Sequence, residues 1–161
     1  ALELDVLIHA DGCYRINPEL DIDYDVMHYA SRLLEGRDPD NQNKIPAWQK
    51  AIELYRGPFL QGHGDPWILD RRADFQAGYL QALGEMAQFR LSEGRPEMAL
   101  ALYQRAITEN GRREDIHREI MRLYTSLGRR SEAAAHYQKL VGDLKDRLTP
   151  ETRAVYEEIM A

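Results

Sequence analysis

Few residues in this sequence could carry chemistry, and they are scattered. His63 lies in the segment Gly62-His63-Gly64-Asp65, where a histidine near a carboxylate could act as a base beside the group that orients it. The glycines favour a turn with a solvated imidazole instead. The sequence shows no nucleophile elbow, no glycine-rich phosphate loop with a lysine, and no histidine or cysteine pair at metal-ligand spacing. We therefore expect no catalytic residue, no metal and no cofactor, and an enzyme or small-molecule sensor built on His63 is a third hypothesis beside the two given below.

The other reactive side chains are expected to be structural. His28, His117 and His136 stand singly on predicted helices, and His117 falls at a position that should pack in the core. Cys13 is the only cysteine, so no disulfide can form within the chain, and a reducing cytoplasm is the natural compartment. We expect Cys13 to be a small apolar residue of a strand.

Composition and charge restrict the class of partner. The 161 residues are 43% apolar and 30% charged, which suits one soluble domain. The net charge of −6 has the opposite sign to a surface that grips phosphates, so we expect DNA contact only through a domain outside this sequence. No apolar run approaches the ~18 residues of a membrane span, and Ala1–Asp5 lacks both the features of a signal peptide and an initiator methionine. We expect a piece of a longer cytoplasmic protein with protein partners and no membrane partner.

The elements that must position these residues are one hairpin and a series of helices. Asp11-Gly12 between two short apolar runs predicts a two-residue hairpin turn, and such a hairpin needs further support from the helices or from a part outside the sequence. Apolar residues at three- and four-residue spacing then predict helices. These run from about 23 to 36, from 46 to 56, and over 67–92, 96–108, 113–127, 131–147 and 149–160.

Particular residues should define these helices. Gly36 is expected to be a C-cap and Thr149 an N-cap. One face of the first helix should be buried, and it consists of Val26, Met27, Ala30, Leu33 and Leu34. Trp48 and Trp67 are expected to be core anchors. Arg71 and Arg72 should pair with Asp70 and Asp74 or hold carbonyls of the glycine-containing connector 59–66.

A repeat of 34 residues decides the fold class. Gly94-Arg95 and Gly128-Arg129 lie 34 residues apart, and each is followed at the same spacing by an alanine and then a tyrosine, Ala99 with Tyr103 and Ala133 with Tyr137. The glycine allows a tight turn between two helices, the alanine allows close approach, and the tyrosine fills the space between pairs. The pattern resembles the tetratricopeptide repeat. We predict an all-α helical repeat array of about three helix pairs plus a terminal helix, with a short N-terminal β-hairpin.

The repeat also predicts a binding surface. In stacked pairs the first helix of each pair lines the concave face. The exposed positions of that face are Gln81 and Gln88 in one repeat and Asp115, Arg118, Arg122 and Thr125 in the next. Arg118 and Arg122 lie one turn apart, so together they could hold a carboxylate or phosphate of a partner. The alternative is a solvated face with intrahelical pairs such as Glu114 with Arg118.

Several segments together resemble the bacterial transcriptional activator domain of the antibiotic regulatory protein (SARP) family of regulators. They are Gly12–Ile16, Ile22–Asp25, Ala51–Leu60, Trp67 with Arg71, Glu119–Met121, Leu127–Arg129 with Glu132-Ala133, Leu144–Leu148 and Pro150–Thr152. The resemblance implies that residues 1–17 form a hairpin remaining from a preceding winged-helix DNA-binding region. Residues 18–161 would then form the activator domain.

Two functional hypotheses follow. The first is a non-catalytic regulatory domain of a bacterial transcriptional regulator. It would contact another domain of its own chain, a second copy or the transcription machinery, and it would position a DNA-binding domain outside this sequence. The second is a peptide-binding scaffold outside transcription, because a repeat fold alone does not fix function. The sequence upstream of Ala1 would distinguish them.

Overall fold

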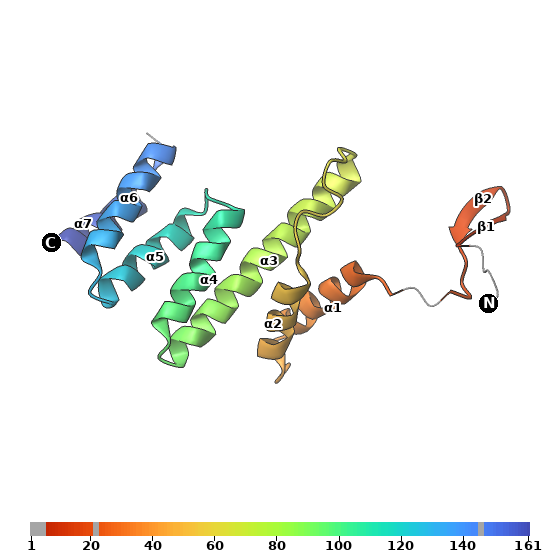
Figure 1. Ribbon diagram of the computed structural model, residues 1–161, viewed down its shortest axis with the longest axis horizontal. Helices are drawn as coiled ribbons and strands as arrows, with labels where there is room; N and C mark the ends of the chain where they lie inside the picture. Colours follow the sequence, from red (N-terminus) through yellow and green to blue (C-terminus); the bar gives the residue numbers. More distant parts are fainter. Residues whose placement is uncertain (1–5, 21–22, 145–146) are drawn as a thin grey trace.

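The computed structural model describes residues 6–20, 23–144 and 147–161, and within them it shows one hairpin followed by seven helices (Figure 1). The hairpin consists of β1 (Leu7–Ala10) and β2 (Cys13–Ile16), and the helices are α1 (Asp25–Arg37), α2 (Lys44–Leu54), α3 (Pro66–Ser92), α4 (Pro96–Glu109), α5 (Glu114–Ser126), α6 (Arg130–Leu144) and α7 (Pro150–Met160). The predicted fold class is confirmed. Ala1–Asp5, Ile22, and the predicted course of the sixth helix through residues 145–146 lie outside the described residues.

The hairpin closes through the predicted turn. Asp11 and Gly12 have φ values of 55° and 77°, and two positive φ values in a row give the turn that matches the twist of a two-stranded sheet. Leu7 pairs with Ile16 and His9 with Tyr14, so these four side chains share one face. That face is largely exposed, and in the described residues no helix packs against the hairpin, which stands apart from the array (Figure 1).

The helices pack as consecutive pairs, α1 with α2, α3 with α4 and α5 with α6, and α7 covers the end against α5 and α6. One hydrophobic core runs from α1 through to α5. A smaller cluster of Met121, Ala133, Val155 and Ile159 seals α7 onto the last pair. This is the one-dimensional stacking expected of repeats, in which each pair buries its apolar face against the next.

The two glycine hinges are structurally equivalent. Gly94 and Gly128 have φ values of 71° and 75°, a conformation that an L side chain rarely adopts. The following residues close matching bonds, with Arg95 N–H donating to Arg90 O at 2.9 Å and Arg129 N–H donating to Tyr124 O at 2.7 Å. This glycine-terminated helix end satisfies carbonyls that the helix leaves open and reverses the chain toward the second helix of the pair.

The repeated alanines and tyrosines have the predicted roles. Ala99 and Ala133 are 0% exposed, which allows their helices to approach the first helix of each pair closely. Tyr137 stacks on Tyr156 of α7 with ring centroids 3.9 Å apart. Tyr55, at the equivalent position of α2, stacks on Tyr79 of α3 at 4.0 Å. Aromatic rings therefore fill the junctions between successive pairs.

Gly36 does not cap its helix as predicted. It lies inside α1, it is buried, and a Cβ at this position would lie 2.5 Å from Cδ2 of the Trp48 indole. The missing side chain therefore allows Trp48, which is 1% exposed, to lie flat against the α1 backbone. The prediction that Trp48 anchors the core is confirmed. Gly36 makes room for the ring of this tryptophan and does not end the helix in a turn.

Two further expectations were wrong, and a third was confirmed for the position of the residue but not for its side chain. Leu34 and Met27 were expected on the buried face of α1, but they are 67% and 65% exposed. The buried face is centred on Tyr29 and Leu33, which lie against Phe75 and Gly78 of α3. Thr149 precedes α7 at the N-cap position without making a side-chain cap. Its hydroxyl instead donates to Oε2 of Glu114 at 2.7 Å, because α5 presents a carboxylate there.

Replacing Gly36 with alanine should destabilise the protein despite alanine's better helix propensity. The added methyl group would meet the Trp48 ring, and overpacking of a rigid buried ring costs more than the ~1 kcal/mol that alanine contributes to a helix. We expect a net loss of about 1–2 kcal/mol in the free energy of unfolding, measured by chemical denaturation. The matched control is Gly84→Ala in α3, where a Cβ meets nothing within 4 Å, so stability should rise by about 0.5–1 kcal/mol. Equal effects of the two substitutions would contradict this account.

Candidate binding groove

A groove of about 430 Å³ lies between α3 and α5, and we call it the α3–α5 groove. It is lined by Leu80, Gln81, Gly84, Glu85, Gln88, Tyr103, Arg113, Asp115, Ile116, Arg118, Glu119 and Arg122. Five of the six residues predicted for the concave face are therefore together in one groove, namely Gln81, Gln88, Asp115, Arg118 and Arg122. The sixth, Thr125, is not among the lining residues, and its hydroxyl donates to the Met121 carbonyl at 3.0 Å.

The wall that α3 contributes carries two glutamines and a glycine. Gln88 Nε2 donates to the hydroxyl of Tyr103 at 2.7 Å, and Gln81 Oε1 accepts from Arg37 Nε at 2.9 Å. Each glutamine thus uses one end of its amide and keeps the other end available. Gly84 lies between them, and the space that a Cβ would enter is open.

Most charges that α5 brings to the groove are paired. Arg113 binds Asp115 through two bonds of 2.9 and 2.6 Å, and this hydrogen bonding lowers the pKa of the Asp115 carboxyl. Arg122 donates to Glu119 at 2.5 Å, so Arg118 and Arg122 do not act as one cationic pair. These pairs are partly exposed and contribute little to stability, but they fix the positions of the side chains.

Arg118 differs from its neighbours because it has no carboxylate within salt-bridge distance in the described part of the chain. Its Nη1 donates to Oγ1 of Thr152 on α7 at 3.0 Å. The alternative pairing with Glu114 is not formed, because Oε2 of Glu114 accepts from the Thr149 backbone N–H and from the hydroxyls of Thr149 and Thr152 at 2.6–3.0 Å. Burial acts to raise the pKa of Glu114, but the hydrogen bonds from Thr152 and Thr149 outweigh it and lower that pKa.

Two histidines that the sequence treated as single form a pair behind the groove. His117 is 7% exposed, and its Nδ1 lies 2.8 Å from Nε2 of His136 on α6. His117 Nε2 lies 3.1 Å from the Gly111 carbonyl, which can only accept, so this nitrogen carries the proton. Nδ1 of His117 must then accept from His136. Burial lowers the pKa of both rings, and the neighbouring His117 adds to the effect on His136, whose pKa falls to about 4.

A second surface lies at the other end of the array. Trp67, predicted as a core anchor, is instead 61% exposed, because it lies at the start of α3, and this end of the helix projects beyond α1 and α2 (Figure 1). Phe59 of the connector meets its indole edge-on. The predicted clamp is confirmed for Arg72, which donates to the carbonyls of Phe59, Leu60 and His63 at 2.6–2.9 Å. A second cavity of about 410 Å³ is lined by the start of α1, the end of α2, residues 55–61 and Phe75, and most of these side chains are aromatic or aliphatic.

His63, the histidine considered as a possible base, is not joined to a carboxylate in the described residues, and no hydrogen bond joins it to Asp65. Within residues 6–20, 23–144 and 147–161 no three side chains of the histidine, cysteine or acidic type come together as metal ligands. In the same part of the chain, every helix is too short or too polar to span a bilayer.

A scan against protein-family models matches residues 23–160 to the bacterial transcriptional activator domain. The chain belongs to this family. A search of curated proteins found no match. The family match begins just before α1 and ends with α7, so the match covers the helical array with the α3–α5 groove, and the hairpin lies outside the matched residues.

The remaining groove residues of the activator domain had only weak signals in the sequence. Gly84 could have been noticed as a glycine in the middle of a strong helical pattern, which costs stability unless it has a purpose. Arg113 lies just before α5, and its side chain joins the groove through its bond to Asp115. Tyr103 was assigned to filling the junction between pairs, and it does so while its hydroxyl also reaches the groove.

The histidine pair should make the free energy of unfolding of the activator domain depend on pH, and this dependence should begin at a higher pH than the one caused by protonation of carboxylates. Because the folded state lowers both pKa values below the ordinary 6.5, the unfolded state binds more protons, and stability present above pH 6.5 is lost as the pH falls toward about 4. A histidine whose pKa falls from 6.5 to about 4 loses at most about 1.4 kcal/mol between pH 7.5 and 5.5. After allowance for the partial exposure of His136, we expect a loss of roughly 1 kcal/mol, measured by denaturation at pH 7.5, 6.5 and 5.5. His136→Gln should flatten this dependence, whereas His63→Gln, in the exposed connector, should leave it unchanged. A steep dependence that survives in His136→Gln would assign it to other groups.

Proposed function

We propose that this activator domain is a non-catalytic interaction module of a bacterial transcription regulator, acting in the cytoplasm. It would hold a protein segment in the α3–α5 groove and position a DNA-binding domain supplied by residues outside this sequence. Family membership supports the role in transcription. The acidic net charge of −6 supports the assignment of DNA contact to another part of the regulator.

The observation that carries the interaction role is the groove itself. It combines buried apolar side chains, Leu80 and Ile116, with polar groups held in place by bonds to neighbouring helices. Gln88 is held by Tyr103 and Gln81 by Arg37. Concave sites with an apolar lining and a few oriented polar groups are typical of binding surfaces.

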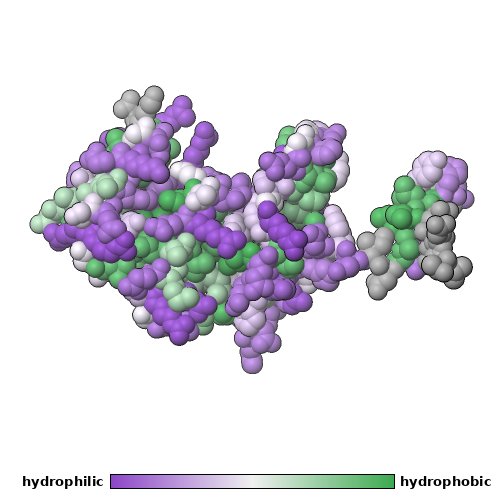
Figure 2. Space-filling view, in the orientation of Figure 1, coloured by the Kyte–Doolittle hydropathy of each residue, from purple (hydrophilic) through white to green (hydrophobic). Residues whose placement is uncertain are grey.

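The hairpin supports the second part of the proposal. One of its faces carries Leu7, His9, Tyr14 and Ile16, and the exposed fractions of Leu7, Tyr14 and Ile16 are 56%, 76% and 57%. The hydrophobic colour on this hairpin is visible in Figure 2. An isolated two-stranded hairpin is marginally stable in water, so this face needs a cover. We propose that residues 1–17 complete a winged-helix region and that its core provides the cover, while residues 18–161 form the activator domain.

The proposal can be tested in the full-length regulator. Removal of residues 23–160 should leave specific DNA binding in place, measured by electrophoretic mobility shift on the regulator's own promoter, and should reduce transcription from a reporter to the basal level. A full-length parent without a helix-turn-helix region upstream of Ala1, or a truncated regulator that activates as well as the intact one, would contradict the proposal. The first result would favour a scaffold outside transcription.

A further inference from the structure

The open space above Gly84 is the first sign of what the α3–α5 groove accepts. Glycine inside a helix costs roughly 1 kcal/mol relative to alanine, so it calls for a physical reason. Gly36 and Gly78 have one, since a Cβ there would meet Trp48 or Leu33. Gly84 has none inside the molecule, because a Cβ would meet nothing within 4 Å. The consequence of this glycine lies in the groove, where the α3 backbone is left open to close approach.

The two glutamines on either side of Gly84 are suited to a peptide backbone. Gln81 Oε1 is occupied by Arg37, which leaves Nε2 free to donate, and Gln88 Nε2 is occupied by Tyr103, which leaves Oε1 free to accept. They lie seven residues apart on α3, roughly 10 Å along the axis, which equals about three residues of extended chain. A helical partner satisfies its own backbone groups, whereas an extended segment offers carbonyls and N–H groups to such amides.

Arg118 supplies the charged contact on the opposite wall. Thr152 occupies one of its five donors, and Glu114, whose pKa it helps to lower, is held by Thr149 and Thr152. The guanidinium is partly buried, which makes an added carboxylate more valuable than it would be at an open surface. Glu85, the groove's other charged group without a partner, is exposed and contributes less.

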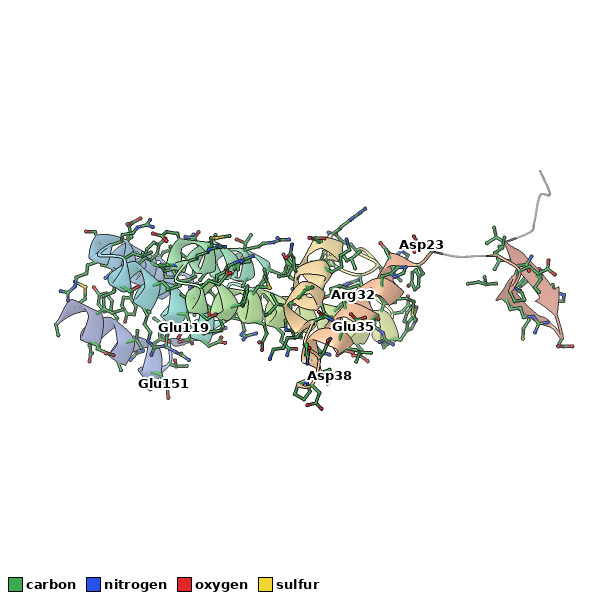
Figure 3. The ribbon with its side chains drawn as sticks, turned by 90° about the horizontal axis from the view of Figure 1, so that it is seen from below. Asp23, Arg32, Glu35, Asp38, Glu119 and Glu151 are labelled. Atoms are coloured by element: carbon green, nitrogen blue, oxygen red, sulfur yellow. The ribbon has the colours of Figure 1, made fainter. Side chains whose placement is uncertain are left out.

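The surroundings of the groove disfavour a strongly acidic partner. Seen from below in Figure 3, Glu119 of α5 and Glu151 of α7 lie along the same side of the array as Glu35 and Asp38. Glu119 and Glu35 are paired with Arg122 and Arg32, so the repulsion of a run of acidic residues comes from Asp38, Glu151 and the net charge of −6. A single carboxylate aimed at Arg118 avoids that repulsion.

We propose that the α3–α5 groove binds an extended peptide segment of a partner protein that runs along α3 and places one aspartate or glutamate side chain on Arg118. The segment passes close over Gly84, and its backbone bonds to Gln81 and Gln88. The inference rests on the proposed interaction role and adds to it the conformation and the charge pattern of the partner.

A library of random nonapeptides displayed on phage tests this inference, with the 161-residue chain as the immobilised target. Selected peptides should share one acidic residue at a fixed position and should lack acidic runs. On synthetic copies, replacing that residue with its amide, glutamate with glutamine or aspartate with asparagine, should weaken binding roughly tenfold or more, measured by calorimetry. The same change in the peptide should have almost no effect on its affinity for the Arg118→Gln variant, because the change in the peptide and the change in the protein remove the same contact.

Matched variants separate groove effects from folding effects. The affinity of Arg118→Lys for the selected peptides should lie between those of wild type and Arg118→Gln. An ammonium group keeps the positive charge but lacks the paired N–H donors of the guanidinium. Arg130→Gln on α6, which also removes one positive charge, should bind like wild type. Gly84→Trp should abolish binding of every selected peptide, whereas Gly142→Trp on α6, where a Cβ also meets nothing within 4 Å, should not. Thermal unfolding of each variant reports its folding.

Each remaining outcome overturns the inference. These outcomes are selection of no peptide above an empty matrix, an acidic preference that persists on Arg118→Gln, binding that survives Gly84→Trp, and selected sequences with helical spacing or acidic runs. The reporter assay keeps this result distinct from the broader proposal. If Arg118→Gln and Gly84→Trp regulators still activate transcription fully, the groove is not the functional contact, but the activator role stands.

Discussion

Close approach of helix backbones is the constraint on which the array depends. Small residues occupy the points where neighbouring helices meet, with Ala51, Ala99 and Ala133 on the second helix of each pair and Gly36 beneath the Trp48 ring. Because these residues present almost no side chain, the larger aromatic rings can lie between successive pairs, and protein interiors are packed too densely to tolerate even an added methyl group. The spacing between α3 and α5, and hence the width of the groove, follows from these contacts.

Three polar groups of the groove are held by residues of other helices. Tyr103 on α4 fixes Gln88, Arg37 on α1 fixes Gln81, and Thr152 on α7 fixes Arg118. Because three helices other than the two walls, α1, α4 and α7, already hold these side chains, little side-chain freedom is lost on binding. The cost of this arrangement is that its charges are mostly satisfied internally, which leaves Arg118 as the distinctive group.

The array could be predicted from patterns between residues that are close in the sequence. The features that could not be predicted depend on contacts between different helices. Gly94 and Gly128 act within one turn of chain, so their spacing in the sequence revealed the hinges and, through the repeat frame, five of the six groove positions. Gly36 looked like a helix end because its real reason, Trp48, is contributed by another helix. Thr125, whose hydroxyl bonds back to its own helix, is not among the residues that line the groove.

The same reasoning explains the errors at Trp67 and at the histidines. Trp67 was predicted to be a core anchor. Whether the start of α3 has a neighbouring helix to bury it depends on the lengths of α1 and α2. The contact of His117 with His136 joins residues 19 positions apart across two helices, and no local pattern encodes it. Periodicity reports which face of a helix is buried, and it is silent on the identity of the residue on the other side.

The way α7 is attached has a dynamic consequence. It rests on a separate cluster of four buried side chains and on the hydrogen bonds that Glu114 receives, while the main core ends at α5. In a linear array the terminal unit has a neighbour on one side only, so its opening free energy is lower than that of the centre. Fraying would thus start at the C-terminus, where hydrogen exchange would find the fastest helical amides. Each such opening also frees the guanidinium of Arg118 that Thr152 holds, which links the motion of the last helix to the charge that the groove presents.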